Sequence, residues 1–418
     1  MSAPERSAFA VLTPPGRGGI AVLRCAGPGA EAALGTCFRP ARAKKRTLSG
    51  DTGGMPTRLS AWACSQSPEA CPRKDGVGMP PPGCLAYGHI VDADGRPLDE
   101  IILCHLAQPP VFEVNCHGGP AAVAAVSRRL SDLGLEPVDA DQLLRTQGAT
   151  PIERDARRLL RAAQTPLAAR VLLDQLDGAL ARALAHMDGC LRQNRADEAV
   201  TEIDALLARW RQCGRFLADP PRIVIAGRPN VGKSTLLNRL VGADRAITSP
   251  APGTTRDYVE AEAALDGVPV VLVDTAGLGE GRDALERLGV ERARGELARA
   301  SLVLYLLDAS EGAGAEDEAV LRSLGERGLA VWNKVDLAPR PSGAPGVSAL
   351  LGEGVAALTA AILARLGYQS VAAGDAVPFT AEQAQILADV RQLARTGKAD
   401  AARRALEGLA GGAPLSEA

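Results

Sequence analysis

Residues 227–234 read GRPNVGKS, which places two glycines, a lysine and a hydroxyl at a fixed spacing. An apolar run, Ile223–Ala226, precedes them, and the apolar spacing of 235–240 predicts a helix directly afterwards. In such a strand–loop–helix unit, backbone N–H groups surround a phosphate at the helix N-terminus. We expect Lys233 to contact the β- and γ-phosphates and the Ser234 hydroxyl to bind Mg²⁺. The alternative is a plain glycine-rich turn with an exposed lysine. It is disfavoured because such a turn would not need a strand before it and a helix after it.

Two further motifs downstream supply groups that a γ-phosphate and Mg²⁺ require. In the segment 253–257, Gly-Thr-Thr-Arg-Asp, the hydroxyl of Thr255 completes the Mg²⁺ shell when a γ-phosphate is present. The segment 274–277, Asp-Thr-Ala-Gly, ends a predicted buried strand. The carboxylate of Asp274 can hold a water on Mg²⁺, and the Gly277 N–H can sense the γ-phosphate.

The base-reading motif is 333–336, Asn-Lys-Val-Asp, at the end of another predicted strand. Asp336 can accept hydrogen bonds from guanine N1–H and N2–H, which adenine does not offer. Residues 348–350, Ser-Ala-Leu, fit the loop that backs the base. Four motifs in this order predict GTP binding, with contacts from Asn230, Val231, Gly232, Lys233, Ser234, Thr235, Ser249, Thr254, Thr255, Asp274, Thr275, Ala276, Gly277, Asn333, Lys334, Asp336, Ser348 and Ala349.

The residue that orients the attacking water is less obvious. Leu278 follows the Asp-Thr-Ala-Gly motif, where Ras-type enzymes place a glutamine. Beyond a pliable Gly279–Gly281 segment, Glu286 is the carboxylate that could swing in to orient the water. From the residues alone, Glu286 is equally well explained as a solvated charge in the first turn of a helix.

Length and composition narrow the class of protein. The chain has 418 residues and a net charge of −2, and only 3% of its residues are aromatic, so base-stacking platforms are not expected. It contains neither an apolar run of about 20 residues nor a signal-peptide pattern, which predicts a cytoplasmic protein without a membrane partner. Its nine cysteines include no CxxC pair, as expected in a reducing compartment.

The chain divides by pattern into four segments. Residues 1–135 predict an α+β domain that includes a hairpin around Asp94-Gly95, with a poorly ordered connection at 40–83. Residues 136–219 are helical, with a seam of leucines between Leu173 and Leu191 that we assign to one helix face; His186 lies at its edge and is not expected to be a ligand. We expect a doubly wound α/β P-loop G domain at 220–368, inserted in the helical domain, which resumes at 369–418 in a shortened form.

The motifs, their flanks and this domain order resemble the tRNA-modification GTPase family MnmE/TrmE. Supporting segments are 227–234, 252–257 (PGTTRD) and 285–292 (LERLGVER), and upstream 13–19 and 113–120 match the family's folate-binding N-terminal domain. The resemblance implies a K⁺-stimulated GTPase whose G domains dimerise face to face, with a flavoprotein partner and tRNA. It further implies that Asn230 is a K⁺ ligand and that Glu286 orients water.

Two departures separate this chain from the family pattern. Of four charged folate contacts, Arg24 and Glu113 are matched, but no lysine occurs between Lys74 and Lys233, and the C-terminal Phe-Cys-Ile-Gly-Lys segment is not matched after Cys213. We therefore expect weak binding of 5-formyltetrahydrofolate. Two hypotheses follow: a GTPase that acts in wobble-uridine modification of tRNA, or a GTP-dependent switch or assembly factor that has lost this chemistry. A nucleotide-binding scaffold without turnover is disfavoured by the Mg²⁺ ligands and Glu286.

Overall fold

The computed structural model describes residues 6–13, 18–41, 62–64, 79–107, 111–243, 259–274, 295–339 and 343–411. The chain forms two compact units, Met1–Thr150 and Pro151–Ala418. None of the helices in these ranges combines the length and apolar character that crossing a membrane requires. Most of the 40–83 connection and part of the 13–19 turn lie outside the described residues.

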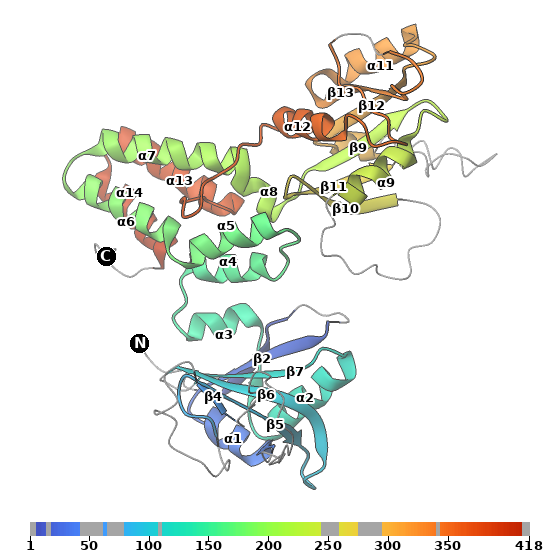
Figure 1. Cartoon of the computed structure of the whole chain (residues 1–418). Coiled ribbons are helices and arrows are strands. Elements are labelled where there is room, and N and C mark those ends of the chain that lie inside the picture. Colours follow the sequence, from blue (N-terminus) through green and yellow to red (C-terminus); the bar gives the residue numbers. More distant parts are fainter. Residues whose placement is uncertain are drawn as a thin grey trace, which may run out of the picture. The chain divides into compact units, whose positions relative to one another are not determined.

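The first unit is an α+β domain with one mixed sheet (Figure 1). Its strands follow the order β3-β5-β6-β7-β2-β1-β8, and β4 also pairs with β5. The elements are β1 Ala8–Val11, β2 Ile20–Ala26, α1 Ala30–Cys37, β3 Phe38–Pro40, β4 Trp62–Cys64, β5 Cys84–Val91, β6 Pro97–Ala107, β7 Val111–His117, α2 Pro120–Asp132, β8 Glu136–Pro137 and α3 Ala140–Thr146.

Alternation of side chains explains how this sheet is covered. In β7 the even-numbered residues Phe112, Val114 and Cys116 are buried, whereas the residues between them are partly exposed. The buried face packs against α1 and α2 through apolar residues such as Leu34 and Leu130. The predicted hairpin around Asp94-Gly95 is confirmed as the antiparallel pair β5–β6.

The second unit combines helices with a five-stranded sheet. Its elements are α4 Pro151–Leu160, α5 Pro166–Leu176, α6 Ala179–Arg192, α7 Ala196–Arg209, a π-helical turn Trp210–Gly214, α8 Arg215–Ala218, β9 Arg222–Gly227, α9 Lys233–Ala243, β10 Val259–Leu265, β11 Val268–Asp274, β12 Leu302–Asp308, α11 Ala315–Leu324, a 3₁₀ turn Gly325–Arg327, β13 Gly328–Asn333, α12 Val355–Arg365, α13 Ala381–Arg395 and α14 Ala399–Ala410.

The sheet has the order β10-β11-β9-β12-β13, and all its neighbours except β10 and β11 are parallel. Helices α9 and α12 cover one face, where Leu236 and Leu358 join the core. The opposite face packs against 295–299 and α11 through Leu297 and Leu321. The inner strands β9, β11 and β12 are nearly continuous apolar runs, because both of their faces are buried. The predicted doubly wound G domain is confirmed.

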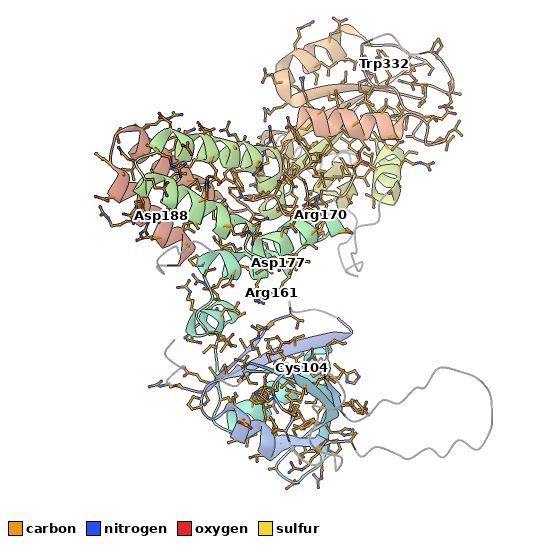
Figure 2. All side chains as sticks on the ribbon, turned by 60° about the vertical axis from the view of Figure 1, so that its left-hand side comes forward. Cys104, Arg161, Arg170, Asp177, Asp188 and Trp332 are labelled. Carbon is orange, nitrogen blue, oxygen red and sulfur yellow. The ribbon has the colours of Figure 1, made fainter. Side chains whose placement is uncertain are left out.

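The helical core is built from segments that precede and follow the G domain in the sequence. Leu184 of α6 and Leu207 of α7 share one apolar cluster with Leu387 of α13 and Leu406 of α14. In Figure 1 the green helices α6 and α7 accordingly lie beside the red helices α13 and α14. The buried Asp188, labelled in Figure 2, links α6 to α14 through Arg403 at 2.9 Å. The G domain is therefore inserted in a helical domain, as the sequence predicted.

The predicted leucine seam needs one correction. It does not lie on one continuous helix, because Gly178 has a φ of 88° and separates α5 from α6. Glycine tolerates this left-handed conformation, in which a helix cannot continue. Leu173 is consequently 48% exposed, whereas Leu180 and Leu184 are fully buried.

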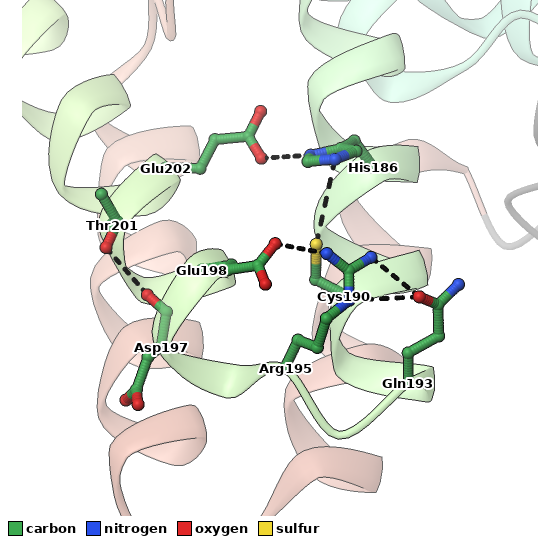
Figure 3. A network of polar contacts seen from close by, with 8 residues as sticks. All are labelled: His186, Cys190, Gln193, Arg195, Asp197, Glu198, Thr201 and Glu202. Atoms are coloured by element: carbon green, nitrogen blue, oxygen red, sulfur yellow. Dashed lines mark hydrogen bonds and ion pairs between the residues drawn. The ribbon is translucent and has the colours of Figure 1, made fainter.

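The α6–α7 hairpin carries a polar network on its outer side (Figure 3). His186 Nδ1 lies 2.7 Å from Glu202 Oε2, and the ring's Nε2 lies 3.9 Å from the buried Cys190 Sγ. Burial raises the pKa of the Cys190 thiol above its ordinary value. Arg195, at the N-cap of α7, pairs with Glu198 in the first turn of that helix. The network joins two helices at their surface, and the described residues contain no cluster of three metal-ligating side chains.

Candidate functional site: a nucleotide pocket at the carboxyl ends of the G-domain strands

The loop between β9 and α9 has the shape that a phosphate requires. Gly227 and Gly232 have φ angles of 145° and 95°, and an added Cβ at Gly232 would lie 2.3 Å from Asn333 Nδ2. Side chains at these positions would therefore be both strained and obstructed. Asn230, at φ 60°, is exposed at the tip of the loop.

Lys233 lies inside this loop. Its side chain is buried, and Nζ donates to the carbonyl oxygens of Gly227 at 3.1 Å and Arg228 at 2.8 Å. Two backbone carbonyls thus hold the ammonium within the turn that would surround a β-phosphate. The predicted loop and its lysine are brought together as the sequence motif requires.

A pair of oxygen ligands stands at the start of α9. Ser234 Oγ donates to Asp274 Oδ2 at 2.5 Å, and Asp274 is 2% exposed at the end of β11. A hydroxyl and a carboxylate are both hard oxygen donors, and Mg²⁺ prefers a small number of these together with phosphate oxygens and waters. The donor set therefore fits Mg²⁺ beside the phosphate loop.

The base-reading loop is tied to the phosphate loop. The buried Asn333 donates from Nδ2 to the Val231 carbonyl at 2.8 Å and accepts from the Ala349 N–H at 3.0 Å. Lys334, at φ 61°, pairs with Asp308 at 2.5 Å. Asp336 is exposed, as a group that reads a bound base must be before the base arrives. Ser348 is fully buried and its Oγ caps the Leu351 N–H at 3.1 Å.

The structure therefore gathers one part of the predicted site and leaves another undescribed. Residues 227–235, Asp274, 333–336 and 348–349 converge at the carboxyl ends of neighbouring strands, where open α/β sheets bind ligands. The predicted residues Ser249, Thr254, Thr255, Thr275, Ala276, Gly277 and Glu286 lie outside the described residues.

Sequence reasoning missed three residues that line a small hollow beside the phosphate loop: Arg228, Asp308 and Asp317. Asp308 ends the parallel strand β12, and a carboxylate at that edge was a usable signal. Burial alone would raise the pKa of Asp308, but hydrogen bonds from Lys334 and Ser310 hold that pKa below its ordinary value. Asp317 lies in α11 and meets Arg228 from 89 residues away, so no local pattern indicates it.

The first unit contains the other predicted pair. Arg24 of β2 faces Glu113 of β7 in register, and Glu113 Oε1 lies 2.5 Å from Arg24 Nη2 and 3.1 Å from Nε. The Arg24 and Glu113 side chains are 12% and 21% exposed. Arg24 Nη1 also lies 3.5 Å from Gln147 Oε1. The two predicted folate contacts are thus partners of each other in this structure.

The strand order, the phosphate loop after β9 and the Asn-Lys-Val-Asp segment after β13 define the class of P-loop GTPases. Comparison with known proteins agrees with this class. Residues 222–334 match the family model "50S ribosome-binding GTPase", and residues 7–140 match "GTP-binding protein TrmE N-terminus".

Whole-chain relatives narrow the class to a family. The chain is 36% identical over 403 residues to the tRNA modification GTPase MnmE of Parasynechococcus marenigrum, covering 86% of this chain and 81% of the relative. It is 35% identical over 364 residues to the Chloroflexus aurantiacus protein of the same name, covering 78% and 72%. The chain therefore belongs to the MnmE family and is a GTPase. A crystal structure of Aquifex aeolicus Era bound to GDP·AlF₄⁻ is 31% identical, with a TM-score of 0.29 and coverage of 36% of this chain and 58% of that one.

Proposed function

We propose that this chain hydrolyses GTP in a Mg²⁺-dependent reaction that K⁺ stimulates, and that two G domains pair face to face during turnover. The observation that carries the nucleotide part is the arrangement of Lys233 inside its loop with Ser234 and Asp274 beside it. Lys233 supplies a cation for the phosphates, and Ser234 at the start of α9 and Asp274 at the end of β11 supply two oxygen ligands for Mg²⁺.

Each residue has a role that follows from its atoms. Lys233 binds the β- and γ-phosphates, and Asp336 selects guanine through two donors that adenine lacks. Thr255 completes the Mg²⁺ shell. Glu286 orients the attacking water, because Leu278 occupies the position of the water-orienting glutamine of Ras-type enzymes. When bound, Mg²⁺ supplies positive charge to the phosphate oxygens.

The K⁺ proposal depends on the loop tip. Asn230 holds a left-handed backbone conformation and an exposed side chain, so its amide oxygen can reach an ion at the nucleotide. A monovalent cation there would stabilise developing charge as an arginine finger does in other GTPases. Face-to-face pairing of G domains would enclose this region and exclude water.

The biological substrate that we propose is tRNA, modified at wobble uridine together with a flavoprotein partner. Its support is that both relatives above are tRNA modification GTPases, and the chain covers 72% and 81% of their lengths. Mass spectrometry of wobble uridines tests it in a deletion strain complemented with the natural chain or with Lys233→Ala. Restoration by the natural chain alone is expected; the same nucleoside profile in deletion and parent strains would refute the proposal.

A second candidate is a GTP-dependent switch or assembly factor that retains the nucleotide cycle without the modification chemistry. One observation favours it: no lysine lies between Lys74 and Lys233, so a folate contact of the family pattern is absent. The same tRNA measurement separates the two, because a switch of this kind would leave wobble uridines unchanged.

A further inference from the structure

A buried carboxylate outside the motifs is bonded to the phosphate loop. Asp317 of α11 is 1% exposed, and Arg228 of the loop approaches it with both arms of its guanidinium, Nε at 3.1 Å and Nη2 at 2.7 Å. Such a two-point contact fixes orientation as well as distance. Arg228 is also the residue whose carbonyl oxygen accepts from Lys233 Nζ.

The Asp317 carboxylate accepts hydrogen bonds from two other groups in addition to Arg228. The Tyr305 hydroxyl of β12 donates to Oδ1 at 3.0 Å, and the Gly314 N–H at the start of α11 donates to Oδ2 at 2.8 Å. Burial also raises the pKa of Tyr305 to about 12, so this hydroxyl keeps its proton. Asp317 is thus immobile, and its position is set by the sheet and by α11 together.

The loop needs such an anchor at this point. Arg228 follows Gly227, whose φ of 145° is open only to glycine, and glycine restrains its neighbours least. The peptide carbonyls of Gly227 and Arg228 must nevertheless stay in place, since both accept from Lys233. The side chain of Arg228 supplies the restraint that its backbone lacks.

Gly314 leaves the space that this contact occupies. A Cβ added at Gly314 would lie 2.6 Å from Arg228 Nη2, although the backbone there, with φ −98° and ψ 172°, accepts any residue. Alanine at 314 would therefore displace the guanidinium without removing a charge and without backbone strain.

We propose that Asp317 is a positioning residue for GTP hydrolysis: by clamping Arg228 it fixes the carbonyls that hold Lys233 against the phosphates. The proposal rests on the phosphate-binding role of Lys233 given above. A purely structural role, as a residue that caps α11, would leave nucleotide binding and turnover of the folded protein unchanged.

The main test compares Asp317→Asn with Asp188→Asn in the full chain. Asp188 is a matched control, because it too is a carboxylate that is 1% exposed and bonded to arginine, in its case Arg192 and Arg403. Unlike Asp317, it lies on α6 in the helical core (Figure 2). Measured below the unfolding transition, Asp317→Asn is expected to lower GDP affinity and kcat/KM for GTP about tenfold or more. Asp188→Asn is expected to lower Tm while leaving both within twofold.

Two further variants test the geometry. Gly314→Ala should reproduce the loss of kcat/KM, because it moves Arg228 away from Asp317. Arg228→Gln should lose as much as Asp317→Asn, and the double variant should lose no more than either, since the pair acts as one unit. Additive losses, or a normal kcat/KM in Asp317→Asn and Gly314→Ala, would overturn the proposal.

The variant Lys233→Ala distinguishes an error in the role of Asp317 from an error in the proposed nucleotide site. If Lys233→Ala binds GDP normally by calorimetry, the role of the lysine itself is wrong. If Lys233→Ala abolishes binding while Asp317→Asn and Gly314→Ala are normal, only the positioning role of Asp317 is wrong. Should Asp317→Asn fail to fold, Gly314→Ala together with Tyr305→Phe, which removes one donor from the carboxylate, still decides the question.

Discussion

Ser234 Oγ donates to Asp274 Oδ2 at 2.5 Å, which joins the first turn of α9 to the end of β11. The two residues are 40 positions apart and come from different predicted motifs. Their contact brings a hydroxyl and a carboxylate to the same side of the phosphate loop, as a Mg²⁺ site requires.

This contact predicts a specific metal dependence. Chelation of Mg²⁺ should stop GTP hydrolysis, and Ser234→Ala should raise the Mg²⁺ concentration for half-maximal rate about tenfold or more, because one direct ligand is lost. Rates measured across a Mg²⁺ series test this. Ser323→Ala, which removes an exposed hydroxyl bonded to a helical carbonyl in the same domain, is the control and should behave as the natural chain. An unchanged Mg²⁺ requirement in Ser234→Ala would exclude the hydroxyl as a ligand.

The exposed Asp336 should set nucleotide choice. We expect the protein to bind GDP and GTP and to ignore ATP. Asp336→Asn should weaken GTP by about 2–4 kcal/mol, since an acceptor pair is replaced by a mismatched amide. The same amide can donate to a carbonyl at C2, so the variant should gain affinity for xanthosine nucleotides. Calorimetric titrations with the three bases decide this, and equal affinities for ATP and GTP in the natural chain would contradict it.

Turnover should depend on the monovalent cation. With Leu278 in the glutamine position and Asn230 in the loop, hydrolysis is expected to be faster in KCl than in NaCl at equal ionic strength. Glu286→Ala should lower kcat tenfold or more, about 1.4 kcal/mol of barrier, with GDP affinity nearly unchanged. Steady-state rates and GDP titrations provide the measurement. Identical rates in the two salts, or normal turnover of the variant, would count against the proposed mechanism.

Asp317 gives a prediction about pH. Burial alone would raise the pKa of this carboxyl, but the Gly314 N–H, the Tyr305 hydroxyl and the charge of Arg228 hold it below its ordinary value. A lowered folded-state pKa contributes stability above the unfolded value, about 3.9, which is lost as pH falls through the folded value. The difference in unfolding free energy between the natural chain and Asp317→Asn, roughly 1–3 kcal/mol, should therefore be constant from about pH 8 to 5 and shrink below pH 4.

Urea titrations of both proteins measure this difference. Arg228 is 44% exposed, so solvent screening places the expected value toward the lower end of that range. A difference that grows as the pH is lowered would mean that Asp317 is destabilising when ionised, contrary to its four contacts.

The sequence predicted the elements whose signals are local. The hairpin predicted around Asp94-Gly95 is the antiparallel pair β5–β6, and Gly95 has the left-handed φ of 82° that such a turn uses. The phosphate-binding and base-reading motifs were likewise predictable, because each directly follows an apolar run that forms a strand. The break at Gly178 was missed although Asp177-Gly178 is also an Asp-Gly pair, because helical apolar spacing continues on both sides of it. The Arg228–Asp317 contact was missed because only tertiary packing of α11 beside β12 brings these residues together.

The Arg24–Glu113 pair of the first unit is where the family pattern and this sequence disagree. Arg24 and Glu113 are matched, yet they bond to each other at 2.5 Å and no lysine lies between Lys74 and Lys233. A ligand with glutamate carboxylates would have to share Arg24 with Glu113 and would lack a cationic partner. We therefore predict that 5-formyltetrahydrofolate binds weakly or not at all, whereas GDP binds tightly to the same preparation.

The magnitude follows from the missing contacts. A charge-assisted hydrogen bond contributes about 1.5–3 kcal/mol, so the loss of one lysine contact alone weakens affinity by roughly one to two orders of magnitude. Arg145 of α3, in the arginine-rich segment 145–170, offers an alternative, because arginine recognises carboxylates well. Calorimetry with 5-formyltetrahydrofolate separates these outcomes. Micromolar affinity that Arg24→Ala abolishes would favour substitution by arginine and strengthen the tRNA-modification proposal; no detectable binding would favour the GTP-dependent switch.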